Sequence, residues 1–134
     1  MQLIQVPGAP TPAGHYSQAI VSHGLLFVSG ILPIDLFTGE KYADADITRQ
    51  TEVVLANLEQ ILQAANSRLS QVVRTTVYIT DIAYWPTVNT IYARAFGAHR
   101  PARTIVPTGP LHYGFRIELD AIAEVISPEA SVRK

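Results

Sequence analysis

The chain has 134 residues, of which 48% are hydrophobic and 16% are charged, and its formal net charge is −1. This length predicts one globular domain over residues 1–134 with a single core. The small charge gives no electrostatic reason to expect nucleic acid or an anionic membrane as the main partner. A chain without cysteine has no disulfide, no thiolate metal site and no Cys nucleophile.

The sequence predicts neither a membrane-spanning helix nor a signal peptide. No apolar run approaches the ~20 residues that a membrane-spanning helix needs. The N-terminus also lacks the basic start and apolar centre of a signal peptide. We therefore expect a cytoplasmic protein.

The first third of the chain predicts three strands. Residues 3–6 form a short first strand, and residues 7–14 are a loop rich in proline and glycine. Residues 19–22 and 25–29 then form a hairpin around the turn at His23 and Gly24. The second strand of this hairpin is apolar without alternation, which indicates that both of its faces are buried.

Two helices follow, separated by one strand. Residues 46–65 form the clearer helix, with Asp46 as its N-cap and an apolar stripe at steps of three and four. Residues 72–80 alternate as a strand, with one face made of Val73, Thr75, Val77 and Ile79. Pro86 suits the first turn of the second helix, which ends at Gly97. Helix, strand and helix in succession indicate a crossover in an α/β layer.

Residues 102–106 and 115–125 are the last two strands, and four chain breakers lie between them. We predict an antiparallel hairpin with its turn at 107–114. This register places Arg103 opposite Glu118 on one face of the sheet. The apolar face would comprise Val106, Phe115, Ile117, Leu119 and Ala121. The other face would comprise Arg103, Ile105, Arg116, Glu118 and Asp120.

An arginine facing a glutamate has two interpretations. It can be a cross-strand ion pair on a solvated surface, which contributes only ~0–1 kcal/mol. It can also be a small-acid site, in which the guanidinium of Arg103 binds a carboxylate and Glu118 acts as a base or holds water. The residues alone leave both interpretations open.

The predicted order of elements is βββαβαββ, an α+β fold with a mixed six-stranded sheet and both helices on one face. The opposite face, with Arg74, Tyr78, Arg103 and Glu118, has no cover from its own chain. It is too apolar at residues 25–28 and at Ile105 to face water. A closed symmetric oligomer is the simplest way to bury it.

Other kinds of site receive little support. The four histidines (His15, His23, His99 and His112) show no helical i, i+4 pair. The chain has no Gly-x-Ser-x-Gly elbow, no phosphate-binding loop and no dinucleotide fingerprint. We therefore expect neither a metal nor a cofactor.

Several segments together resemble the Rid family, the reactive intermediate deaminases formerly called YjgF. Residues 101–106, followed by residues 117–123, are similar to the family's C-terminal signature. Residues 14–19 resemble its Gly-Pro-Tyr-Ser-Gln-Ala segment, with His15 in place of proline. Further similar segments are Val28-Ser29-Gly30 with Pro33, Thr38-Gly39-Glu40, and residues 88–92.

This resemblance implies a fold similar to the small trimeric chorismate mutases, a homotrimer with a barrel-like centre and sites in the clefts between subunits. It implies hydrolysis of 2-aminoacrylate-derived enamines and 2-imino acids, such as 2-iminopropanoate and 2-iminobutanoate, to 2-oxo acids and ammonia, without a cofactor. The implied binding residues are Arg103, Tyr16, Ser29 and Asn89. Arg103 would hold the substrate carboxylate and Glu118 the attacking water. Ile105, where many members carry cysteine, would form a pocket wall.

Three alternatives remain. A trimeric regulatory protein could bind a small acid in the same clefts without turnover. A specialised catabolic deaminase could act on a larger enamine, because Ile105 and the loop residues Leu111, His112 and Tyr113 depart from the family pattern. Nucleic-acid activity has been attributed to parts of the family, but the slight acidic excess gives it no support.

Overall fold

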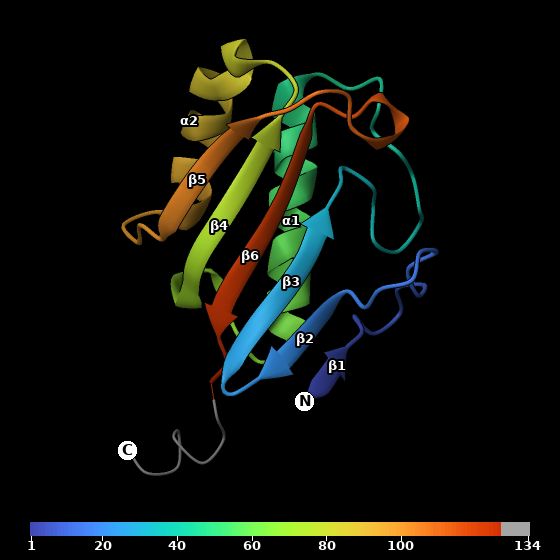
Figure 1. Ribbon diagram of the computed structural model, residues 1–134, viewed down its shortest axis with the longest axis vertical. Helices are drawn as coiled ribbons and strands as arrows, with labels where there is room; N and C mark the ends of the chain where they lie inside the picture. The colour runs from blue at the N-terminus through green and yellow to red at the C-terminus, as the bar shows by residue number, and fades with distance from the viewer. Residues whose placement is uncertain (127–134) are drawn as a thin grey trace.

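The predicted order βββαβαββ is confirmed by the computed structural model, which describes residues 1–126 (Figure 1). The strands are β1 (Gln2–Ile4), β2 (Ala19–Ser22), β3 (Leu25–Ile31), β4 (Val72–Ile79), β5 (Ala102–Pro107) and β6 (Ile117–Glu124). The helices are α1 (Ile47–Ala64) and α2 (Trp85–Phe96), with short 3₁₀ turns at Leu69–Gln71, Ile82–Tyr84 and His112–Gly114.

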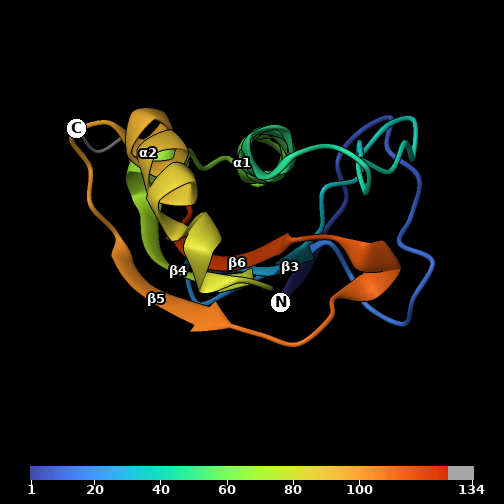
Figure 2. The ribbon, with the colours of Figure 1, turned by 90° about the horizontal axis from the view of Figure 1, so that it is seen from above.

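Both helices lie on the same face of the mixed sheet, as predicted (Figure 2). The core lies between that face and the helices, and its largest buried side chains include Leu26, Leu58, Leu62, Ile79, Ile117 and Leu119. In the described part of the chain, no helix combines the length and the apolar character needed to cross a membrane.

The predicted hairpin of the last two strands is wrong. The sheet order is β1-β2-β3-β6-β4-β5, so β4 lies between β5 and β6. β4 pairs in parallel with β5 and antiparallel with β6. The physical reason is the connection lengths. The segment from 108 to 116 is longer than a usual hairpin loop and can pass over the end of β4, while α2 supplies the crossover that parallel strands require.

This strand order changes which face each polar residue occupies. Arg103 is in register with Thr75, and Glu118 is in register with Tyr78. Thr75 is buried under α2, where its hydroxyl is 2.7 Å from that of Tyr92. Tyr78 lies on the opposite, open face. Arg103 and Glu118 therefore point to opposite faces of the sheet, and the prediction that they face each other is wrong.

Three apolar residues also differ from the predicted pattern. Ile105 pairs with Val77 on the helix side, and Val106 pairs with Tyr78 on the open side. Both exchange faces because β5 is registered against β4 rather than β6. Val73 is 44% exposed, since the β4–β6 register shifts between Val72 and Arg74. The apolar run of β3 is buried on one face rather than on both: Leu26 and Val28 lie beneath the helices, whereas Phe27 is exposed on the open face.

The open face carries a row of apolar side chains across four strands. Leu3, Ile20, Phe27 and Ile122 are in register on neighbouring strands. Leu3 is 69% exposed and Phe27 is 44% exposed. Among residues 1–126 nothing covers this row, so the predicted uncovered face is confirmed in its strands β1–β3 and β6. Apolar side chains in such a row favour association with another surface.

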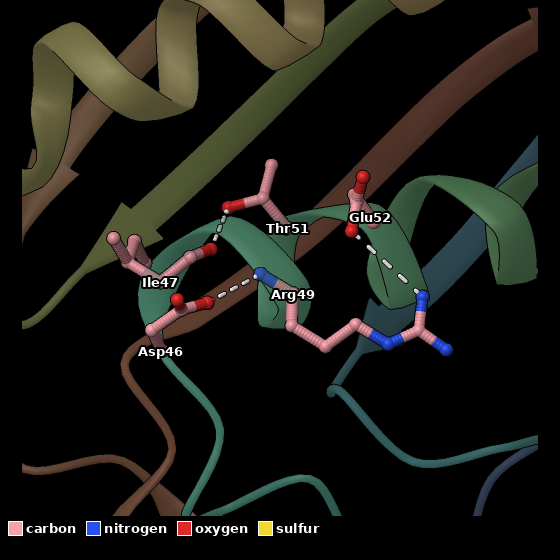
Figure 3. A network of polar contacts seen from close by, with 5 residues as sticks. All are labelled: Asp46, Ile47, Arg49, Thr51 and Glu52. Atoms are coloured by element: carbon pink, nitrogen blue, oxygen red, sulfur yellow. Dashed lines mark hydrogen bonds and ion pairs between the residues drawn. The ribbon is translucent and has the colours of Figure 1, made fainter.

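Helix α1 begins as the sequence predicts, and its start anchors the long loop that precedes it. The carboxylate of Asp46 accepts a hydrogen bond from the backbone N–H of Arg49 at 2.9 Å (Figure 3). The hydroxyl of Thr51 donates to the carbonyl of Ile47, and Arg49 lies 3.8 Å from Glu52. This anchor holds one end of the segment 32–45, and residues of that segment line a pocket beside β3 and β6.

Candidate functional site

A pocket of about 780 Å³ opens where three loops meet beside β3 and β6. The loops come from residues 10–16, residues 32–41 and the turn His112–Gly114. Both ribbon views place these loops on the same side of the molecule, away from α2 and β5 (Figures 1 and 2). The lining includes Tyr16, Ser29 and Glu118, three of the residues predicted from the sequence.

Glu118 is half-buried in this pocket. Its removal from water raises the pKa of its carboxyl group, the nearby His112 lowers that pKa, and the negative charge of Asp120 raises it again. Asp120 itself accepts a hydrogen bond from the hydroxyl of Tyr78 at 2.9 Å. A carboxyl group with a raised pKa in a pocket is suited to exchange protons with a bound molecule.

Gly30 explains how the carboxylate of Glu118 reaches its position. A Cβ atom at residue 30 would collide with the side-chain oxygen of Glu118. The absence of a side chain on β3 therefore makes room for the carboxylate of the neighbouring strand β6. Sequence reasoning named Ser29 but missed the role of Gly30, although its place in the segment Val28-Ser29-Gly30 was the available signal.

Ser29 is hydrogen-bonded to the two residues that follow Tyr16. The Ser29 hydroxyl donates to the carbonyl of Ser17 at 2.7 Å, and its backbone N–H donates to the carbonyl of Gln18 at 3.0 Å. The side-chain oxygen of the buried Gln18 accepts from the backbone N–H of Val6. These bonds hold the loop that presents Tyr16, whose side chain is 57% exposed. Ser29 therefore positions the pocket wall as well as lining it.

Arg103 belongs to a second cluster, between the edge strand β5 and α2. Its guanidinium carbon lies 4.5 Å from the ring centre of Trp85 and 4.8 Å from that of Tyr92. One guanidinium nitrogen donates to the side-chain oxygen of Asn89 at 3.1 Å. Burial raises the pKa of the Tyr92 hydroxyl, while its bond to Thr75 and the charge of Arg103 lower it.

The guanidinium of Arg103 is oriented but has no acidic partner. Within residues 1–126 the one ion pair present is Arg49 with Glu52. Stacking on two rings and a bond to an amide fix the plane of the guanidinium without neutralising it. Arg103 can therefore bind a carboxylate that comes from outside the chain.

Trp85 and Tyr92 were not predicted as site residues. Their spacing with Asn89, at i, i+4 and i+7, places all three on one side of α2, and this is the signal that could have found them. Ile105, the predicted pocket wall, lies two residues beyond Arg103 on the same strand and packs against the core. Asn89 therefore joins the Arg103 cluster, and neither Asn89 nor Ile105 is among the residues that line the Glu118 pocket.

The two clusters lie apart within one chain. Across β4, Arg103 is level with Ala121, which is three residues from Glu118. Two strand spacings and three residue steps separate their α-carbons by roughly 14 Å. Their side chains also point to opposite faces of the sheet. One small molecule cannot contact both groups of the same protomer.

A metal site would need several acidic or imidazole side chains close together. Among residues 1–126, no three side chains of His, Asp or Glu lie close enough together to hold a metal ion. The polar groups of the pocket and of the Arg103 cluster are suited instead to hydrogen bonding and proton transfer on a small organic acid.

Comparison with known proteins finds a matching family model and several related proteins. A family model described as Endoribonuclease L-PSP matches residues 7–125. The chain is 39% identical over 122 residues to Reactive Intermediate Deaminase A, chloroplastic, of Arabidopsis thaliana, covering 91% of this chain and 65% of the relative. A Rid family protein from Yersinia pestis shares the fold, with a TM-score of 0.87, 38% identity and coverage of 92% and 98%. E. coli TdcF, solved with bound serine, has a TM-score of 0.86, 30% identity and coverage of 94% and 100%.

Proposed function

Because this chain belongs to the Rid family, the family of the Endoribonuclease L-PSP model, we propose that it hydrolyses reactive 2-imino acids to 2-oxo acids and ammonia. The observation that carries the proposal is the guanidinium of Arg103. It is oriented by two aromatic rings and an amide, and it has no carboxylate partner within residues 1–126. Such a group matches the carboxylate that every 2-imino acid carries.

The proposed site is shared between two copies of the chain. Arg103 with Asn89 would come from one protomer, and Glu118 with Tyr16 and Ser29 from its neighbour. The separation of the two clusters within one chain supports this arrangement, since a small acid cannot span them. The apolar row on the open face supports association of copies. We propose a closed trimer, in which each of three clefts receives one cluster from each side.

The reaction needs modest assistance because an imine carbon is already electrophilic. Arg103 would bind the carboxylate of the substrate and fix its orientation. Ionised Glu118 would accept a proton from water as the water oxygen bonds to the imine carbon. That proton passes to the nitrogen and gives an amino alcohol. The hydroxyl proton of this adduct then also moves to the nitrogen, the C–N bond breaks, and ammonia leaves as the carbonyl forms. Tyr16 would orient the substrate by a hydrogen bond, and no cofactor takes part.

The direct test generates 2-iminopropanoate with an amino-acid oxidase and follows its decay with and without the protein. We expect faster decay, with release of ammonia and pyruvate in equal amounts. Binding of 2-oxobutanoate without acceleration of decay would support the regulatory protein instead. The serine bound to TdcF shows small-acid binding for that relative, and both alternatives are consistent with it.

Endoribonuclease activity is the activity that the family description names. A protein that binds RNA mainly through phosphates needs clustered positive charge, whereas this chain has a net charge of −1. We therefore place imine hydrolysis first. Incubation of the purified protein with labelled single-stranded RNA provides the corresponding check, and we expect no cleavage.

The expected cytoplasmic location stays a prediction.

Replacing Glu118 with glutamine is expected to lower kcat for imine hydrolysis by ~100-fold, the usual range for loss of a general base. The raised pKa of Glu118 also predicts that wild-type kcat increases with pH through a midpoint above the usual value of 4.5. The Glu118→Gln variant should not show this increase of kcat with pH. Glu124→Gln, at an exposed position further along β6, is the matched control and should keep both kcat and its pH dependence.

The same substitution should stabilise the fold at neutral pH. A raised pKa means that folding favours protonated Glu118, so this contribution to stability is present below pH 4.5 and is lost as pH rises through the folded value. At pH 7 the ionised carboxylate is therefore unfavourable where it is buried. Thermal unfolding at pH 7 should show a Tm for Glu118→Gln that is higher by on the order of 1–3 °C. A lower Tm would contradict the assigned cause of the shift.

Gly30→Ala tests the position of the carboxylate without removing it. The added Cβ would displace the side-chain oxygen of Glu118, because the far end of that side chain is the part able to move. We expect kcat to fall ~10- to 100-fold, the range for a misplaced catalytic group. Gly109→Ala is the control, since a Cβ at residue 109 meets no atom within 4 Å. Equal kcat for the two variants would exclude the positioning role of Gly30.

A further inference from the structure

Tyr113 is an exposed aromatic residue with an unusual backbone at the edge of the Glu118 pocket. Its φ is 56° and its ψ is 15°, the left-handed region that large side chains seldom occupy. The residue is 63% exposed and lines the pocket. An unfavourable backbone conformation persists where surrounding contacts impose it, and such positions gather at ligand sites.

The surroundings of Tyr113 supply those contacts. Its ring meets the buried ring of Phe115 edge-on, with centroids 5.7 Å apart at 73°. The ring of His112 is 6.0 Å away, and the Lys41 ammonium lies 5.0 Å from the Tyr113 ring centre. A ring held in this way loses little conformational freedom when a ligand packs against it.

The pocket is large, and much of its lining is apolar. This apolar part of the lining includes Pro10, Pro12, Leu32, Leu36 and Ile61. Its volume of about 780 Å³ lies in the range of sites that enclose drug-sized ligands. The imine derived from alanine has only a handful of heavy atoms. A substrate with its reacting carbon at Glu118 therefore leaves space in this pocket for a larger side chain.

We propose that this part of the pocket is a subsite for a large apolar side chain, aromatic or branched aliphatic, of the 2-imino acid, and that Tyr113 forms its wall. The inference rests on the proposed function and adds the substrate class. It assigns Tyr113 a role in specificity, in which the ring contacts the substrate side chain while Glu118 acts on the imine.

The pocket lining also contains charged side chains, whose contacts lie within the chain. Lys41 lies over the face of the Tyr113 ring, and His112 lowers the pKa of the Glu118 carboxyl group. Asp35 on the same rim accepts hydrogen bonds from the backbone N–H groups of Phe37 and Thr38. The Lys41 ammonium is therefore engaged with the ring face and the Asp35 carboxylate with its own loop, and the apolar lining is the surface that a substrate side chain can contact.

The test compares imines that an amino-acid oxidase produces from phenylalanine, leucine and alanine, using the intact protein. We expect kcat/KM for the phenylalanine and leucine imines to exceed that for the alanine imine by at least ~10-fold. Tyr113→Asn removes the ring and keeps a residue that tolerates the left-handed backbone. This variant should reduce the ratio of phenylalanine to alanine kcat/KM by ~10-fold.

Two further variants serve as controls for Tyr113→Asn. Tyr113→Phe retains the ring and should retain the ratio, and Ile82→Ala removes an apolar side chain that is 58% exposed outside the pocket and should do the same. A ratio near one in the wild type, or a ratio unchanged by Tyr113→Asn, would overturn the subsite while imine hydrolysis itself stands. Failure to accelerate any of the three imines would instead overturn the proposed function.

Discussion

Replacing Arg103 with alanine is expected to lower kcat/KM for hydrolysis of 2-iminopropanoate by ~100-fold. The loss corresponds to a charge-assisted interaction of ~1.5–3 kcal/mol between the guanidinium and the substrate carboxylate. The fold should remain, because Arg103 is exposed on an edge strand and forms no ion pair with another residue in 1–126. Ammonia release from freshly generated imine, together with circular dichroism, measures both expectations.

Two other arginine variants separate the contributions of charge and geometry. Arg103→Lys keeps a positive charge but loses the planar fork and the stacking on Trp85 and Tyr92, so its kcat/KM should be intermediate. Arg94→Ala removes an exposed arginine from α2 and should leave kcat/KM within two-fold of the wild type, since variation of that size is ordinary for surface changes. Unchanged ammonia release by Arg103→Ala would contradict the assignment.

Mixing two inactive variants is expected to restore activity. If each site takes Arg103 from one protomer and Glu118 from its neighbour, Arg103→Ala and Glu118→Gln damage different halves of it. Random assembly of equal amounts into closed trimers leaves about one site in four with both native groups. Co-expression, or joint unfolding and refolding, should therefore recover about a quarter of wild-type kcat per site.

The matched control for this experiment carries both substitutions in one chain. Mixing that double variant with Arg103→Ala cannot place a native arginine beside a native glutamate, so no activity should return. Recovery by the first mixture and none by the second would establish a site shared between copies. If the first mixture stayed inactive although the variants co-assembled, as mass measurement of the intact oligomer can show, both groups would have to act within one protomer.

Local patterns were sufficient to predict the elements of this protein. The N-cap at Asp46 and the apolar stripe after it defined α1 to within a residue, because capping and helical periodicity are properties of neighbouring residues. The alternation of apolar and charged residues also predicted the two faces of β6 correctly. Ile117 and Leu119 lie in the core, and Glu118 lies on the other side. Glu118, Ser29 and Tyr16 line one pocket, and their roles there stay predictions.

The partner of each strand was decided only by the tertiary structure. Alternation shows which residues of a strand share a face, but it does not show which neighbour the strand joins. Insertion of β4 between β5 and β6 brings Arg103 under α2, beside Trp85 and Asn89, and leaves Glu118 on the opposite side. Strand pairing depends on contacts between distant segments. The sequence therefore determined the elements and the candidate site residues, and the packing of β4 decided that these residues form two separate clusters.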